Sequence, residues 1–174
     1  KIKAEGTKPE TLASANIALS GSPLAWIREF HTLGGFTLLC SMLDGLASKP
    51  KKSEDELKCT HLLIDAIEIL VNVDGNQLTQ HKSDPIFIVP PTTAVNTLCL
   101  ALVDKTVDMQ YVGTLAKLLT VICLFKGGYN LVLDGFQHIS EVKNEKRRYS
   151  TLIKLLATEG QWDAAFYILT LVNS

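Results

Sequence analysis

Hydrophobic residues recur at three- and four-residue steps along most of the chain, whereas few segments alternate apolar and polar positions as strands do. This period predicts helices near residues 11–19, 23–30, 36–47, 57–72, 93–103, 109–125, 129–140, 149–157 and 162–172. The run 86–89 has a strand-like composition, but no second strand is available to pair with it. The pattern therefore predicts an all-α chain of roughly eight to ten helices.

Turn-forming residues mark the expected ends of these helices. Ser22 is a plausible N-cap with Pro23 at the first helical position, and Pro90 and Pro91 precede the helix at 93–103. The segment Val73-Asp74-Gly75 is expected to end the helix that begins near Leu57.

A repeated glycine pair is the most informative feature of the pattern. Gly34-Gly35-Phe36 recurs as Gly127-Gly128-Tyr129, and each pair is followed by a helical apolar period. The offset of 93 positions is about two units of the ~40–47 residues typical of armadillo and HEAT repeats. A second repeated segment is Leu-Val-Asn, which occurs at 70–72 and at 171–173, each time at an expected helix end. These repeats predict an α-solenoid of armadillo-like helical repeats.

Two of the expected helices are apolar on all but one narrow face. In residues 62–72, the polar positions Asp65, Glu68 and Asn72 share that face. In residues 115–125, Lys117, Thr120 and Leu124 have the corresponding spacing and share one face. Inner helices of a solenoid have this pattern, so we expect both stripes to line a concave binding surface.

Composition and charge narrow the possible functions. The net charge of −1 provides no basic field for a nucleic-acid backbone, and no uninterrupted apolar run approaches the ~18 residues of a membrane span. The four cysteines are far apart and mostly within apolar runs, as expected for buried reduced thiols of an intracellular protein.

No motif for catalysis is found. The pair Gly34-Gly35 lacks the following lysine of a phosphate-binding loop, and a helix rather than a strand is predicted before it. The four histidines lack the spacing of metal sites, and no serine lies in a G-x-S-x-G motif. We therefore expect neither enzymatic activity nor a cofactor or metal ion.

Several segments, in order, resemble the armadillo region of diaphanous-related formins. ANIALSGSPLAWIREF at 15–30, followed by Gly34-Gly35 and Leu38-Leu39, resembles its start. IEILVN at 67–72, LAKLLTVICLF at 115–125, LIKLL at 152–156 and the apolar run 164–173 resemble its later helices. The resemblance implies that residues 1–23 are the C-terminal part of a GTPase-binding segment. Residues 24–174 would then be an armadillo-repeat domain like formin homology 3.

The resemblance also implies a regulatory function. Such a region binds a GTP-loaded Rho-family GTPase and the formin's own C-terminal autoregulatory helix, and so controls actin filament assembly by domains outside this chain. The implied location is cytoplasmic, at the cytoskeleton and cell cortex.

The residues implied as binding sites follow from the positions that match. Asn72 aligns with the first asparagine of the family's GTPase-contacting pair and Val73 with the second, while Lys8 and Asn16 lie at or near its two basic positions. The groove for the autoregulatory helix corresponds to Lys117, Thr120, Val121, Leu124 and Phe125. Val121 stands where the family has a small alanine.

Another class of function is compatible with the same pattern. An armadillo-type scaffold could bind a different peptide partner, since asparagines such as Asn72 on inner helices can hydrogen-bond a peptide backbone. GTP-dependent binding to a small GTPase would distinguish the two functions.

Overall fold

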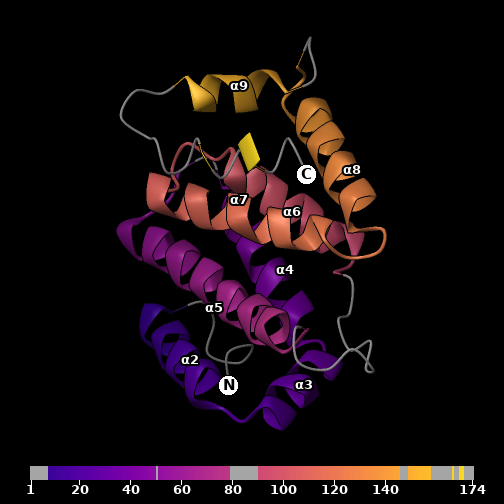
Figure 1. The fold of residues 1–174 in the computed structure, drawn as a ribbon. Helices are drawn as coiled ribbons and strands as arrows, with labels where there is room; N and C mark the ends of the chain where they lie inside the picture. Colours follow the sequence, from indigo (N-terminus) through magenta and orange to yellow (C-terminus); the bar gives the residue numbers. More distant parts are fainter. Residues whose placement is uncertain are drawn as a thin grey trace. The chain divides into compact units, whose positions relative to one another are not determined.

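The computed structural model describes residues 8–49, 51–78, 90–145, 149–157, 166, 169 and 170. All regular secondary structure in these residues is α-helical, which confirms the predicted all-α class (Figure 1). The helices are α2 (Pro9–Gly21), α3 (Leu24–Thr32), α4 (Gly35–Ala47), α5 (Glu54–Leu78), α6 (Thr92–Leu102), α7 (Met109–Cys123), α8 (Gly128–Val142) and α9 (Ser150–Leu156). The strand-like run 86–89 and most of the expected helix 162–172 lie outside the described residues.

The chain forms two compact units, Lys1–Ile88 and Val89–Ser174. In the first, α5 packs against both α2 and α4, and α3 contacts α4. In the second, α6, α7 and α8 pack against one another. The expected division into residues 1–23 and 24–174 concerns family domains and stays a prediction.

Helix α5 forms much of the core of the first unit. Its fully buried apolar side chains are Leu63, Ile64, Ala66, Ile67 and Leu70. Asp65 and Glu68 are half-buried on the remaining face, as the polar stripe predicted.

The expected end of this helix at Val73-Asp74-Gly75 is wrong, because α5 continues to Leu78. A single glycine inside a helix costs only about 1 kcal/mol, which neighbouring helical hydrogen bonds can offset. Asn72 therefore lies within α5 and does not end it.

The start of α5 is also earlier than predicted, at Glu54 instead of near Leu57. Ser53 and Glu56 form a reciprocal capping box. The Ser53 N–H donates to Glu56 Oε2 at 2.8 Å, and the Glu56 N–H donates to Ser53 Oγ at 3.3 Å. Lys49 forms an ion pair with the Glu56 carboxylate. The loop before α5 is thus tied to its first turn.

The predicted cap of α3 is wrong by one residue. Pro23 occupies the N-cap position, and its carbonyl accepts hydrogen bonds from Trp26 N and Ile27 N. The Ser22 hydroxyl instead donates to the Ala18 carbonyl at 2.6 Å, within the last turn of α2. Serine often bonds back to the carbonyl four residues earlier, and this bond removes it from capping.

The glycine pairs form two equivalent helix-to-helix corners, as the repeat predicted. Gly34 and Gly127 precede α4 and α8 with φ of +82° and +84°, a conformation that side chains disfavour. A Cβ at Gly35 would overlap the Phe30 ring, and one at Gly128 would overlap the Ile122 carbonyl oxygen. The first glycine of each pair is thus favoured for its backbone angle and the second for close approach, most strictly at Gly128, where the neighbouring atom is backbone.

Candidate partner-binding surfaces

Helices α2 and α5 form the surface that carries the predicted GTPase-binding residues. Asn16 Nδ2 donates a hydrogen bond to the Leu62 carbonyl at 2.9 Å. The pKa of Lys58 is raised mainly by its hydrogen bond to Glu54, and Glu10 of α2 adds a smaller contribution. Since Glu10 lies near Lys58 and Asn16 contacts Leu62, the two helices run in the same direction.

Asn16 has a structural contact that the sequence did not reveal. Its side chain is half-buried, and its amide nitrogen is used to join α2 to α5. Its Oδ1 is also buried and has no hydrogen-bond partner among the residues the structure describes. The side-chain amide of Asn16 is thus directed at the helix pair.

Lys8 and Asn72 lie toward opposite ends of this helix pair. Lys8 is exposed and directly precedes α2, two residues before Glu10. Asn72 is 14 positions beyond Lys58 along α5, which corresponds to roughly 21 Å at 1.5 Å per residue. Asn72 and Val73 have a helical backbone, but their side chains lie outside what the structure describes. The backbones of the four predicted residues therefore belong to α2, α5 or the residue before α2, and they do not form a compact cluster.

Ile17 is an exposed apolar residue of α2 that the sequence analysis missed. Its side chain is 76% exposed, whereas Leu12 and Leu19 of the same helix are buried. Leu12 and Leu19 are seven residues apart and share one helical face, and Ile17 falls far from it at 100° per residue. That mismatch with the apolar period is the signal that could have identified Ile17 as a surface residue.

The five predicted groove residues lie together on one accessible face of α7 and the turn that follows. Lys117 is exposed, Thr120, Val121 and Phe125 are half-buried, and Leu124 is 77% exposed. Their spacing of three or four residues places them on a single helical face. The Thr120 hydroxyl donates to the Ala116 carbonyl at 2.9 Å, so this polar group is already used within the helix.

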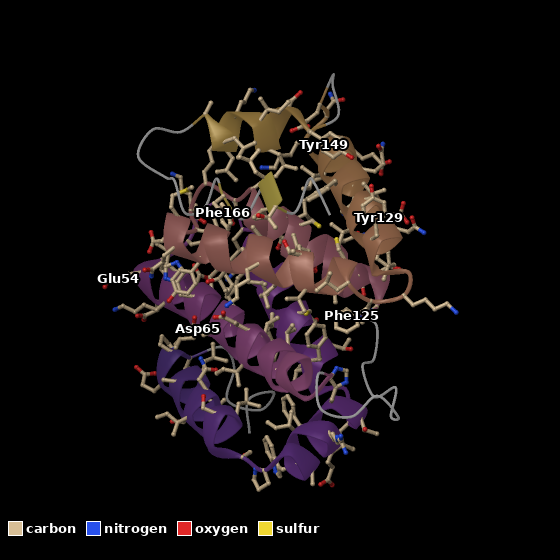
Figure 2. All side chains as sticks on the ribbon, viewed as in Figure 1. Glu54, Asp65, Phe125, Tyr129, Tyr149 and Phe166 are labelled. Atoms are coloured by element: carbon tan, nitrogen blue, oxygen red, sulfur yellow. The ribbon has the colours of Figure 1, made fainter. Side chains whose placement is uncertain are left out.

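This face continues into the corner between α7 and α8. Phe125 precedes Gly127, and Tyr129 in the first turn of α8 is 47% exposed (Figure 2). Leu124, Phe125 and Tyr129 thus give the corner an apolar and aromatic surface of the kind that binds amphipathic helices.

The cysteines are not arranged for reactivity. Cys40, Cys59 and Cys99 are buried and Cys123 is half-buried, and none forms a disulfide. Burial raises the pKa of Cys40 to about 12 and also raises the pKa of Cys99. These thiols stay protonated at neutral pH and are poor nucleophiles.

The described residues also lack two other kinds of feature. Within the described residues, no group of three or more His, Cys, Asp or Glu side chains could hold a metal ion. A helix with the length and apolar character to cross a membrane is likewise absent from those residues.

Comparison with known proteins identifies similar chains. The family model of the diaphanous GTPase-binding domain matches residues 1–124. Formin-A of Dictyostelium discoideum is 26% identical over 158 residues, covering 90% of this chain. Formin-D of the same organism is 27% identical over 169 residues, covering 95%. The matches span only 12% and 13% of the lengths of these two relatives.

A solved structure has a similar fold. It is described as E. histolytica Formin1 bound to EhRho1-GTPgammaS, and it matches with a TM-score of 0.78 at 12% identity. The match covers 97% of this chain and 55% of the other. The armadillo-like helical fold predicted from the repeats is confirmed by this likeness.

Proposed function

Because this chain belongs to the family of diaphanous GTPase-binding domains, we propose that it is a formin regulatory region that binds a Rho-family GTPase in its GTP-bound form. The match of the family model to residues 1–124 carries this proposal. The fold supports it, since a protein of similar structure is described as bound to a GTP-analogue-loaded Rho protein.

We assign the GTPase contact to the α2–α5 helix pair. Asn72 and Val73 lie within α5, and Lys8 is exposed at the other end of the pair. Asn72 lies roughly 21 Å along α5 from Lys58, and a length of this order is compatible with one standard protein interface of about 800 Å² per partner. Residues 1–23 would belong to the GTPase-binding segment and residues 24–174 to the armadillo domain.

The test is a calorimetric titration of this chain with Rho loaded with a GTP analogue or with GDP. Binding should require the GTP analogue, because the proposed partner is the GTP-bound form, as in the solved complex of similar fold. We assign Asn72 as one of the few residues that carry most of the binding energy, so Asn72→Ala should weaken binding at least tenfold, or by about 1.4 kcal/mol.

Asn130→Ala is the matched control, because Asn130 is an exposed asparagine on α8 in the other compact unit. Equal affinity for the two nucleotide states would contradict the proposal and favour a scaffold for a different peptide partner. Equal losses from the two alanine variants would contradict the assignment of the contact to α5.

The face of α7 suggests a second partner for the same chain. Lys117, Thr120, Val121, Leu124 and Phe125 would receive the formin's C-terminal autoregulatory helix, and GTPase binding would release it. The accessible apolar character of Leu124 and Phe125 supports this assignment. This chain would then act without catalysis, in the cytoplasm and at the cell cortex, on actin assembly by domains it does not contain.

Val121 provides a test of the groove. The resemblance implies an alanine at this position in related formins. If their autoregulatory helix packs over that alanine, the larger Val121 side chain should impair the same packing in this chain. Relief of such overpacking is worth about 1–3 kcal/mol, so Val121→Ala should strengthen binding of the autoregulatory peptide about fivefold or more. Fluorescence anisotropy with a labelled peptide measures the change.

Leu124→Asp should abolish the same binding, because it places a charge on an exposed apolar contact. Val142→Asp is the control, since Val142 is an exposed apolar residue at the end of α8. A peptide affinity unaffected by changes at both Val121 and Leu124 would exclude α7 as the groove.

A further inference from the structure

The second compact unit contains a cavity that the proposed GTPase and autoregulatory contacts do not use. Its volume is about 880 Å³, within the range of about 300–1,000 Å³ that is typical of ligand pockets. The loop after α6, the first turn of α7, the end of α8 and the start of α9 all contribute to its wall. The apolar part of that wall is formed by Val103, Val107, Met109, Val112 and Leu155.

Glu145 lines this cavity and is held there by the end of α8. The Glu145 N–H donates to the Ser140 carbonyl at 2.8 Å, and the Asn144 N–H donates to the Glu141 carbonyl at 3.2 Å. Asn144 has a left-handed φ of 48°. These bonds form a Schellman motif with asparagine in place of the usual glycine. The backbone of Glu145 is therefore fixed by the helix terminus.

The carboxylate of Glu145 is only half satisfied. Its Oε1 accepts hydrogen bonds from Thr151 N at 2.9 Å and from the Thr151 hydroxyl. Its Oε2 is buried and has no hydrogen-bond partner among the residues described by the structure. A buried carboxylate oxygen without a donor is costly, so this position favours a ligand that brings a positively charged donor.

Other charged side chains also line the cavity, namely Lys105, Lys143, Lys154, Asp104 and Asp108. Lys143 Nζ donates to the Val103 carbonyl at 2.8 Å, which ties the end of α8 to the loop after α6. Asp104 Oδ1 accepts hydrogen bonds from Thr106 N and Oγ1 at 2.9 and 2.8 Å. These bonds hold two walls of the cavity in place, and none of them uses the Glu145 carboxylate.

We propose that this cavity binds an alkyl cation, an ammonium or guanidinium group carried on a short apolar stem. The cation would pair with the carboxylate of Glu145, and the stem would lie against Val107, Met109 and Leu155. A free amine or guanidine and the lysine or arginine side chain of a bound peptide share this chemistry. The site is separate from the α2–α5 surface, so it does not depend on GTPase binding.

The test is an NMR titration of the isotopically labelled 174-residue chain with n-butylguanidinium. Saturable shifts should appear at residues 103–112 and 143–155. Neutral n-butylurea has nearly the same shape and should bind at least tenfold more weakly. Glu145→Gln keeps the bonds to Thr151 but removes the charge, and it should also reduce n-butylguanidinium affinity at least tenfold.

Glu141→Gln is the matched control, because Glu141 is an exposed glutamate one turn earlier on α8. It should leave the affinity unchanged. Equal binding of the guanidinium and the urea, equal effects of the two glutamine variants, or an absence of saturable shifts would each overturn the proposal.

A peptide arm distinguishes the two sources of the cation. Tenfold tighter binding of N-acetyl-Leu-Arg-Leu-amide than of n-butylguanidinium would assign the site to a peptide side chain, and a smaller difference would assign it to a free cation. In both cases the affinity must fall in Glu145→Gln, and retention of binding there would overturn the proposal.

Discussion

At the scale of single residues, backbone conformation explains features that side-chain chemistry does not. Gly34 and Gly45 are close in sequence but have different environments. Gly34 has a φ of +82° at the corner before α4, whereas Gly45 lies inside α4 with open space where a Cβ would be. The same mutation should therefore have opposite effects at the two sites.

Gly34→Ala should lower the free energy of unfolding by about 1–2 kcal/mol, because alanine disfavours the left-handed conformation. Gly45→Ala should raise it by about 0.5–1 kcal/mol, because alanine is the better helix former. Urea denaturation monitored by circular dichroism measures both changes. Two changes of the same sign would contradict the assigned corner geometry.

At the scale of helices, contacts at the ends fix what the apolar period leaves undefined. The period placed the start of α5 near Leu57, but Ser53 and Glu56 extend the helix to Glu54. Residues 53–56 have the sequence Ser-Glu-Asp-Glu, which is a capping-box pattern, so this start could have been predicted from the sequence. The far end could not, since an Asp-Gly pair lowers helix propensity by only about 1–2 kcal/mol and does not by itself decide whether a helix ends.

Ser53→Ala should lower the free energy of unfolding by about 1 kcal/mol, since it removes the oxygen that caps the Glu56 N–H. Ser53→Asp keeps an acceptor and should retain most of the stability. Chemical denaturation at neutral pH measures the difference. An alanine variant as stable as the wild type would show that the capping box contributes little.

The same cap should make stability depend on pH. Hydrogen bonds from Lys49 and then from the Ser53 backbone lower the pKa of Glu56 below 4.5. Because the folded pKa is the lower one, this stabilisation is present above pH 4.5 and is lost as pH falls through the folded value. Glu56→Gln should therefore lose less stability on acidification than the wild type, and an identical acid response would contradict the Glu56 contribution.

At the scale of the whole molecule, the reactivity of the cysteines should indicate whether the core of each compact unit is folded. Cys40 and Cys59 are buried in the first unit and Cys99 in the second, whereas Cys123 is half-buried. Reaction with a thiol reagent near pH 8 should label Cys123 first, and the other three should react only when their unit unfolds. Mass spectrometry of the labelled chain locates the modified residues.

Cys123→Ser should remove the fast phase of that reaction without changing the slow phases. Burial raises the pKa of Cys40 and of Cys99, so a moderate rise in pH should not by itself make these thiols reactive. Fast labelling of either residue in the folded chain would contradict the packing of its core.

The sequence by itself determined the all-helical class, the two glycine corners and the stripe on α7. These features depend on local period and on backbone freedom, which neighbouring residues specify. Only the tertiary structure decided that Asn16 bonds the Leu62 carbonyl, that Asn72 lies inside α5 and that Glu145 has an unsatisfied oxygen in a cavity. Such features depend on contacts between elements or on the context that stabilises a helix, and no pattern within one segment encodes them.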